Sequence, residues 1–354
     1  MSASAALAGR TALDLFDASS YPTRRVEDWK YSDLSRALRE IPQKGNNINV
    51  DWTSRLAAEG FAVIDVQNGD YNGLRDALAT CAGKLWIRHL GVGGDDAVVG
   101  HQGAGQITVE NNQALTIFET YEGRGTYAGH TDLRISVGEN AQFIRIVVAN
   151  EPVGAVSIRQ SIIDSRPGAR IYQAVFSTGA QFSRFETHVN HAGHGAEIVL
   201  DGAYLLKGKT HFDLTTRVTH GEIDGITAQT LRGLVKDQAT AVFQGRILVE
   251  RGADGTDARM RHQALILNDG AHIRAKPELE IYADDVQCAH GNTIGALDQE
   301  AMFFCQSRGM SEEQARALLT HAFVLPVAEA IPDEILRATV LTFLEDEAED
   351  YHAL

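Results

Sequence analysis

The stretch GENAQFIRIVVANEPVGAVSIRQSIIDSRPGARIYQAVF, residues 138–176, decides the fold class. It holds three β-prone runs, Phe143–Ala149, Ala155–Ile163 and Arg170–Phe176, which are rich in branched apolar residues. Small-residue corners such as Pro167-Gly168-Ala169 separate the runs. Because branched side chains favour strands whereas Gly and Pro favour turns, we expect a mainly β protein.

The same pattern extends from about residue 85 to about residue 290 and includes the run Ala241–Val249. Turn signals recur about every ten residues without intervening helices, which fits either an antiparallel sandwich or barrel, or a solenoid of stacked strands. Repeated corners such as Gly195-Ala196 and Gly270-Ala271 favour the solenoid, a parallel β-helix, because small side chains suit tight stacked corners. Asp-Gly pairs such as Asp201-Gly202 keep hairpins open as the alternative.

Both ends of the chain are predicted to be helical. Patchy apolar spacing predicts helix over residues 5–45, including a short helix from Asp33 to Leu38, and the polar stretch Gln43–Asn49 reads as a linker. The expected parts of the chain are residues 1–85, a helical region, residues 86–297, the β core, and residues 298–354, a helical domain.

Cap signals place the helices of the C-terminal part. Asp298 caps a helix that Gly309 stops, and the run Ser311–Gln314 has the pattern of a capping box. The helix that follows carries apolar residues at helical spacing, and Pro326 is expected to bend or end it.

The charge and the cysteine content limit the function classes. A formal net charge of −15 argues against broad nucleic-acid binding and against docking on anionic membranes. No apolar run is long enough to span a bilayer, and no secretory signal is recognised. The three cysteines, Cys81, Cys288 and Cys305, form no CxxC and predict reduced thiols in a cytoplasmic protein.

Cys288 and His290 are the candidate metal ligands. Residues i and i+2 of a strand face the same side, and thiolate and imidazole both bind iron and zinc. The pair supplies two ligands, so a full site needs others from this chain or from a partner. On pattern alone, the more frequent explanation is that Cys288 packs as a small apolar residue and His290 is a hydrogen-bonded edge residue.

Three histidines at spacing three, His188, His191 and His194, resemble a metal cluster. That spacing suits a helix, which Gly193 and Gly195 oppose, and on a strand His188 and His191 would face opposite sides. We therefore interpret this segment as a solvated turn rich in His and Asn.

Acidic residues flank the Cys288 segment and leave a second function class open. Glu278 and Glu280 would share one strand face, and Asp284 and Asp285 follow them. Such carboxylates are usually exposed charges, but in a β-helix enzyme acting on carbohydrate they would be the catalytic acids. The sequence contains neither a GxSxG nucleophile motif nor a GxxxxGK[ST] phosphate loop, so the chain does not itself look like an ATPase.

Four motifs carry a resemblance that spans nearly the whole chain. They are RVEDWKYSDL at residues 25–34, VFQG at residues 242–245, KPELEIYADDVQCAHG at residues 276–291, and SRG at residues 307–309 with the apolar helix after it. With these motifs the chain resembles the SufB/SufD family of the SUF iron–sulfur cluster assembly system, and the SufD branch in particular. A SufB-like scaffold is the near alternative, but SufB sequences carry H-E-A where this chain has His290-Gly291-Asn292. Family members commonly read H-G-A-T, so Asn292 is a departure.

The resemblance implies a right-handed parallel β-helix between helical ends, and a non-catalytic scaffold subunit. It implies pairing with a SufB-like paralogue through the end of the β-helix, with homodimers when the chain is alone. His290, with Cys288 beside it, would be an interface ligand for iron or a nascent cluster. A SufC-like ABC ATPase would dock on the C-terminal helices, with Leu318, Leu319 and Phe323 as candidate anchors. Some complexes of the family bind reduced flavin, but this sequence locates no flavin site and assigns no role to Cys81 or Cys305.

Overall fold

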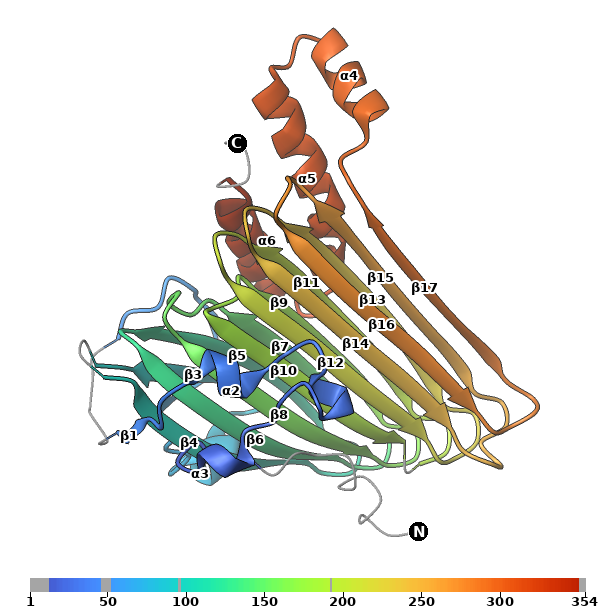
Figure 1. Ribbon diagram of the computed structural model, residues 1–354. Coiled ribbons are helices and arrows are strands. Elements are labelled where there is room, and N and C mark those ends of the chain that lie inside the picture. Colours follow the sequence, from blue (N-terminus) through green and yellow to red (C-terminus); the bar gives the residue numbers. More distant parts are fainter. Residues whose placement is uncertain (1–12, 46–51, 95–96, 192, 350–354) are drawn as a thin grey trace.

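Two parallel β-sheets, wound around a common axis, form the body of the molecule (Figure 1). The structure is a computed structural model that describes residues 13–45, 52–94, 97–191 and 193–349. Within these residues the chain alternates from β3 onward between a nine-stranded and an eight-stranded sheet, one strand of each per coil. This arrangement confirms the prediction of a mainly β protein with a parallel β-helix between helical ends.

The strands of the nine-stranded sheet are β2 (Ala62–Gln67), β3 (Lys84–Val92), β5 (Ala114–Arg124), β7 (Gln142–Ala149), β9 (Arg170–Ser177), β11 (Glu197–Leu206), β13 (Ile226–Val235), β15 (Asp257–Ile266) and β17 (Gln287–Gly295). Those of the eight-stranded sheet are β1 (Gln43–Lys44), β4 (Val99–Val109), β6 (Tyr127–Val137), β8 (Val156–Ser165), β10 (Phe182–His191), β12 (His211–His220), β14 (Thr240–Val249) and β16 (His272–Ile281). The helices are the 3₁₀ turns η1 (Ala18–Ser20) and η2 (Glu27–Trp29), and α2 (Leu34–Ala37), α3 (Leu74–Thr80), α4 (Gln299–Ser307), α5 (Glu312–Glu329) and α6 (Glu334–Glu349).

The small-residue corners explain why the strands stack instead of forming hairpins. At the Pro167-Gly168-Ala169 corner, Ala169 is fully buried and Gly168 has a φ of +65°, which glycine adopts without strain. Asp201-Gly202, the feature that kept hairpins open, lies inside strand β11. A Cβ on Gly202 would lie 2.5 Å from the carbonyl oxygen of Val175, so this glycine permits close approach of neighbouring coils.

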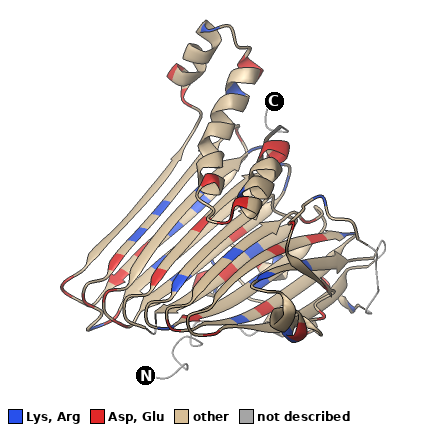
Figure 2. Cartoon of the chain, turned by 180° about the vertical axis from the view of Figure 1, so that it is seen from behind, with Lys and Arg blue, Asp and Glu red and all other residues tan. Residues whose placement is uncertain are grey.

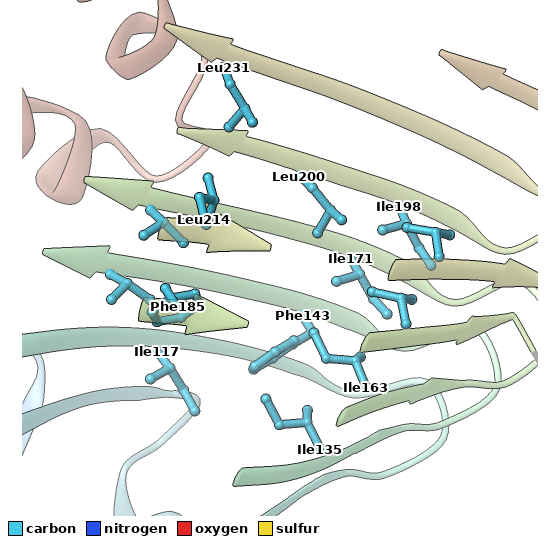
Figure 3. Close-up of a cluster of buried hydrophobic side chains, with 14 of the residues drawn as sticks. Ile117, Ile135, Phe143, Ile163, Ile171, Phe185, Ile198, Leu200, Leu214 and Leu231 are labelled. Carbon is cyan, nitrogen blue, oxygen red and sulfur yellow. The ribbon is translucent and has the colours of Figure 1, made fainter. Parts of the chain in front are cut away.

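Apolar ladders fill the interior between the two sheets (Figure 3). Phe143 pairs in register with Ile171, and Ile171 with Ile198, so equivalent side chains of successive coils stack. Burying each such side chain stabilises the fold by about 1.5–3 kcal/mol. A buried ion pair interrupts the ladders, because Arg145 contacts Glu119 at 3.0 Å and both side chains are almost fully buried. The interior therefore contains polar groups, and each charge in this pair has a partner.

The N-terminal segment is a strap rather than a set of helices. Between residues 13 and 45 the helical pieces are the two 3₁₀ turns and the four-residue α2, so the prediction of helix over residues 5–45 is wrong in its described part beyond that short helix. The apolar residues of the segment instead pack on the outer face of the eight-stranded sheet. Trp29, for example, stacks on Phe182 and lies 4.3 Å from the guanidinium of Arg184. The predicted linker Gln43–Asn49 begins with strand β1, and its last four residues lie outside the described part.

Helices α5 and α6 cover the outer face of the nine-stranded sheet (Figure 2). Lys84 of β3 binds Asp333, which precedes α6, at 2.7 Å. Asp298 caps α4, and Ser311 with Gln314 forms the predicted capping box of α5. Pro326 does not end α5, which continues to Glu329. The division into residues 1–85, 86–297 and 298–354 stays a prediction, although β2 already belongs to the nine-stranded sheet.

Candidate functional site

The two ends of the β-helix differ. Helix α3 closes the first end, where Leu74 and Cys81 are buried in the interior cluster. At the last coil, β16 and β17 are the outermost strands of their sheets (Figure 1). Apolar residues of that coil are uncovered: Ile281 is 41% exposed, Tyr282 58% and Ile294 40%. We call the surface formed by β16, β17 and the turn between them the open end.

Cys288 and His290 lie on one side of β17 at the open end. In register, Cys288 pairs with Ala258 and His290 pairs with Met260, and both β15 residues are buried in the interior cluster. Cys288 is half-buried and packs on that cluster, whereas His290 is exposed. Cys288 and His290 therefore share one face of β17, as the sequence predicts.

Cys288 and His290 are the two candidate metal ligands in the described part of β17. Within the described residues, His, Cys, Asp and Glu side chains form no group of three or more that could hold a metal ion. Partial burial raises the pKa of the Cys288 thiol, so metal binding there has to displace a proton. In the described residues, Cys288 and His290 are thus two candidate ligands on one side of β17.

The flanking carboxylates point away from this pair. Glu278 and Glu280 both lie 3.4 Å from Arg246, and Lys276 contacts Glu278 at 3.2 Å. Leu279, between the two glutamates, packs on the interior cluster, so the glutamates face the outer surface. Because these ion pairs neutralise the carboxylates, the arrangement does not favour the carbohydrate-enzyme alternative. Asp284 and Asp285 lie exposed in the turn after β16.

The histidine-rich segment is mostly strand, so the interpretation as a solvated turn is wrong for its first two histidines. His188 and His191 are buried on β10, while His194 is exposed in the following turn, where it pairs with Asp224 at 2.9 Å. His188 contacts Glu186 at 2.6 Å. His191 contacts Thr227 and stacks on His220 with ring centroids 4.1 Å apart. Each imidazole thus has a structural partner.

Helices α4 and α5 form a hairpin that projects from the body beyond β17 (Figure 1). Of the three predicted anchors, Leu318 is 46% exposed, while Leu319 packs inside the hairpin against Met302 and Cys305. Phe323 is half-buried against the sheet cluster, beneath the guanidinium of Arg232 at 5.2 Å.

Sequence reasoning missed the most exposed apolar residues of this hairpin. Phe303 is 72% exposed and Phe304 57%. The signal was present, because Met302 and Cys305 are buried at i, i+3 spacing on the other side of α4. Two aromatic residues between those positions must point away from the packed side.

Comparison with known proteins identifies the family. Residues 92–323 match the family model described as SUF system FeS cluster assembly, SufBD core domain. The chain belongs to the SufBD family. The match covers more than half of the chain and includes the β-helix from β4 onward, the open end, α4, and α5 as far as Phe323.

Relatives in other organisms support the assignment to this SufBD family. The chain is 27% identical to the iron–sulfur cluster assembly protein SufD of Escherichia coli, over 90% of this chain and 88% of that protein. It is 30% identical to a SufBD family protein of Synechocystis over 64% of this chain, a match that spans about half, 52%, of that relative. A SufBD family protein of Mycobacterium leprae is 24% identical over 94% of this chain and 91% of its own length.

Among the described helices, none is both long enough and apolar enough to cross a membrane.

Proposed function

We propose that this chain is a scaffold subunit that pairs with a SufB-like paralogue through the open end. The observation that carries the proposal is the uncovered last coil, where β16 and β17 are outermost strands and Ile281, Tyr282 and Ile294 are exposed. An exposed strand edge is a template for pairing with another chain. A paralogue with its own β-helix end would continue both sheets and cover these residues, and a second copy of this chain could do so when the paralogue is absent.

His290 and Cys288 would then contribute to an iron or nascent cluster site shared with the paralogue. An iron–sulfur cluster is held by about four protein ligands, largely thiolates with occasional imidazole. This chain offers two candidates on one side of one strand, so the paralogue would supply the remainder. In this role the iron or the cluster is cargo, and the chain performs no catalytic turnover of its own.

The α4–α5 hairpin would be the docking element for a SufC-like ABC ATPase. Its most exposed large apolar residues are Phe303, Phe304 and Leu318. Exposed apolar groups that lie close together often mark a contact surface for another protein. Leu319 and Phe323 would support the hairpin from within. We place this work in the cytoplasm, as the sparse reduced cysteines predict. Binding of a flavin by the complex stays a prediction, and we assign no residues of this chain to it.

The test is reconstitution of the complex from this chain, the paralogue and the ATPase with iron and sulfide. Replacing His290→Ala should leave complex formation unchanged and lower cluster yield several-fold. His272→Ala is the matched control, because His272 is exposed on β16 of the same coil and lies on its outer surface. Unchanged cluster yield with His290→Ala would remove the ligand role. A chain that does not bind the paralogue at all would remove the pairing.

A further inference from the structure

A hydrogen-bond chain runs from the interior to the open end beside His290. The imidazole of His262 on β15 lies between two partners: its Nδ1 is 2.7 Å from Oδ1 of Asn292, and its Nε2 is 2.8 Å from the hydroxyl of Tyr204. Tyr204 and His262 are buried, whereas Asn292 is exposed on β17. This series of hydrogen bonds ends at the exposed amide of Asn292, and the buried His262 fixes the orientation of that amide.

The direction of these hydrogen bonds follows from chemistry. Burial raises the pKa of Tyr204, so its hydroxyl remains a donor, and burial lowers the pKa of His262, so its ring remains neutral. A neutral imidazole has one donor nitrogen and one acceptor nitrogen. Tyr204 donates to Nε2, and Nδ1–H therefore donates to Oδ1 of Asn292.

Aromatic packing prevents the His262 ring from turning. Phe243 lies on the opposite sheet with its ring centroid 4.9 Å from that of His262, and the Tyr204 ring centroid is 6.0 Å away. With Oδ1 held by this ring, the amide nitrogen Nδ2 of Asn292 carries two donors. In the part of the chain that the structure describes, Nδ2 has no acceptor within hydrogen-bond distance.

Asn292 faces the same side of β17 as the candidate ligands. It follows His290 by two residues and Cys288 by four, and residues at these spacings share a strand face. Its register partner is the interior residue His262, as Met260 is that of His290. The free donors of Asn292 and the imidazole of His290 therefore border the same space at the open end.

We propose that the Asn292 amide nitrogen donates a hydrogen bond to a sulfur anion, sulfide or thiolate, of the iron species held beside His290, with His262 and Tyr204 as positioning residues. This inference rests on the proposed function, because the iron species is the cargo assigned there. Hydrogen bonds to cluster sulfur stabilise negative charge and raise the reduction potential. The function of Asn292 is then to stabilise the more reduced, more negative state of the cargo.

The experiment uses the complex assembled with the paralogue and loaded with iron and sulfide. Asn292→Ala removes the donor without adding charge, and the exposed position leaves the His262 Nδ1–H open to water. The expected result is a several-fold lower cluster yield and a lower reduction potential of the cluster that forms. Tyr204→Phe should shift both in the same direction by less, because the ring keeps its packing but the amide loses its fixed orientation.

Thr293→Ala is the matched control, since Thr293 is the next residue and faces the outer side of β17. Wild-type yield and potential with Asn292→Ala would overturn the inference. The inference would also be overturned if Asn292→Ala weakened binding of the paralogue but left the reduction potential of the cluster unchanged. That result would assign the Asn292 amide to the protein interface. If His290→Ala lowers yield while Asn292→Ala does not, this inference fails and the proposed function stands. If neither variant changes yield, the ligand role of His290 and this inference both fail.

Discussion

At the scale of single residues, Cys288 and His290 differ in what surrounds them. Cys288 packs half-buried on the interior cluster, and His290 stands exposed one pleat further along β17. The thiol therefore pays a desolvation cost on ionisation that an exposed group avoids. The contribution of Cys288 to metal binding should accordingly depend on pH.

We predict that the part of iron binding that depends on Cys288 strengthens as pH rises. Burial raises the pKa of Cys288, so at neutral pH the thiol is protonated and the metal must displace the proton. The measurement is iron affinity of the complex between about pH 7 and about pH 9, the range in which such thiols ionise. Cys288→Ser should flatten this dependence, and an equal slope in wild type and variant would contradict the prediction.

At the scale of elements, the α4–α5 hairpin has exposed apolar residues such as Phe303, and it has residues such as Leu319 that pack between its two helices. Phe303→Glu should abolish or strongly weaken ATPase binding with little change in thermal stability, because the side chain is 72% exposed. Pull-down of the ATPase together with a thermal melt measures both effects. Gln306→Glu is the charge control, since Gln306 is exposed on the same helix.

Leu319→Glu should behave in the opposite way. Its side chain packs against Met302 and Cys305, so a buried charge there should unfold the hairpin and lower the melting temperature. If Phe303→Glu bound the ATPase normally while folded, the docking surface would have to lie elsewhere.

The prediction of helix over residues 5–45 is wrong for most of the described N-terminal segment. Its apolar residues occur at patchy helical spacing, but Trp29 and its apolar neighbours are used to cover the outer face of the eight-stranded sheet. The strands that they cover lie far away in the sequence: Trp29 stacks on Phe182, and Ser32 contacts Asp213. Local spacing carries no information about that surface, so helix was overpredicted there.

At the scale of the whole molecule, the buried histidines predict an acid-labile fold. Burial lowers the pKa of His89, His101, His211 and His220 to about 4. The unfolded chain binds these protons near pH 6.5. Stability from each group is therefore complete above about pH 6.5 and falls by about 1.4 kcal/mol per pH unit as pH drops toward 4.

Thermal or denaturant unfolding between about pH 7 and about pH 4 checks this, with a decreasing free energy of unfolding as the expected result. Asp201 opposes the trend, because burial raises its pKa to about 6 and acid favours its folded state, but it is one group against six histidines whose pKa burial lowers. His220→Gln should reduce the slope, and His194→Gln, at an exposed position, should not. A free energy of unfolding that is constant over this range would contradict the prediction.

The sequence by itself determined that the protein is mainly β, that small residues form the turns between strands, that α4 and α5 have N-terminal caps, and that Cys288 and His290 share one strand face. These follow from local rules: side-chain alternation along a strand, the freedom of glycine at corners, and hydrogen bonds within four residues.

Only the tertiary structure decided which end of the β-helix is open, that Glu278 and Glu280 point away from Cys288, and that Asn292 is oriented by His262. The physical reason is that the coils stack about thirty residues apart in sequence, as the pairing of His262 with Asn292 shows. A side chain's partner on the next coil depends on the register of the whole solenoid, which no local pattern records.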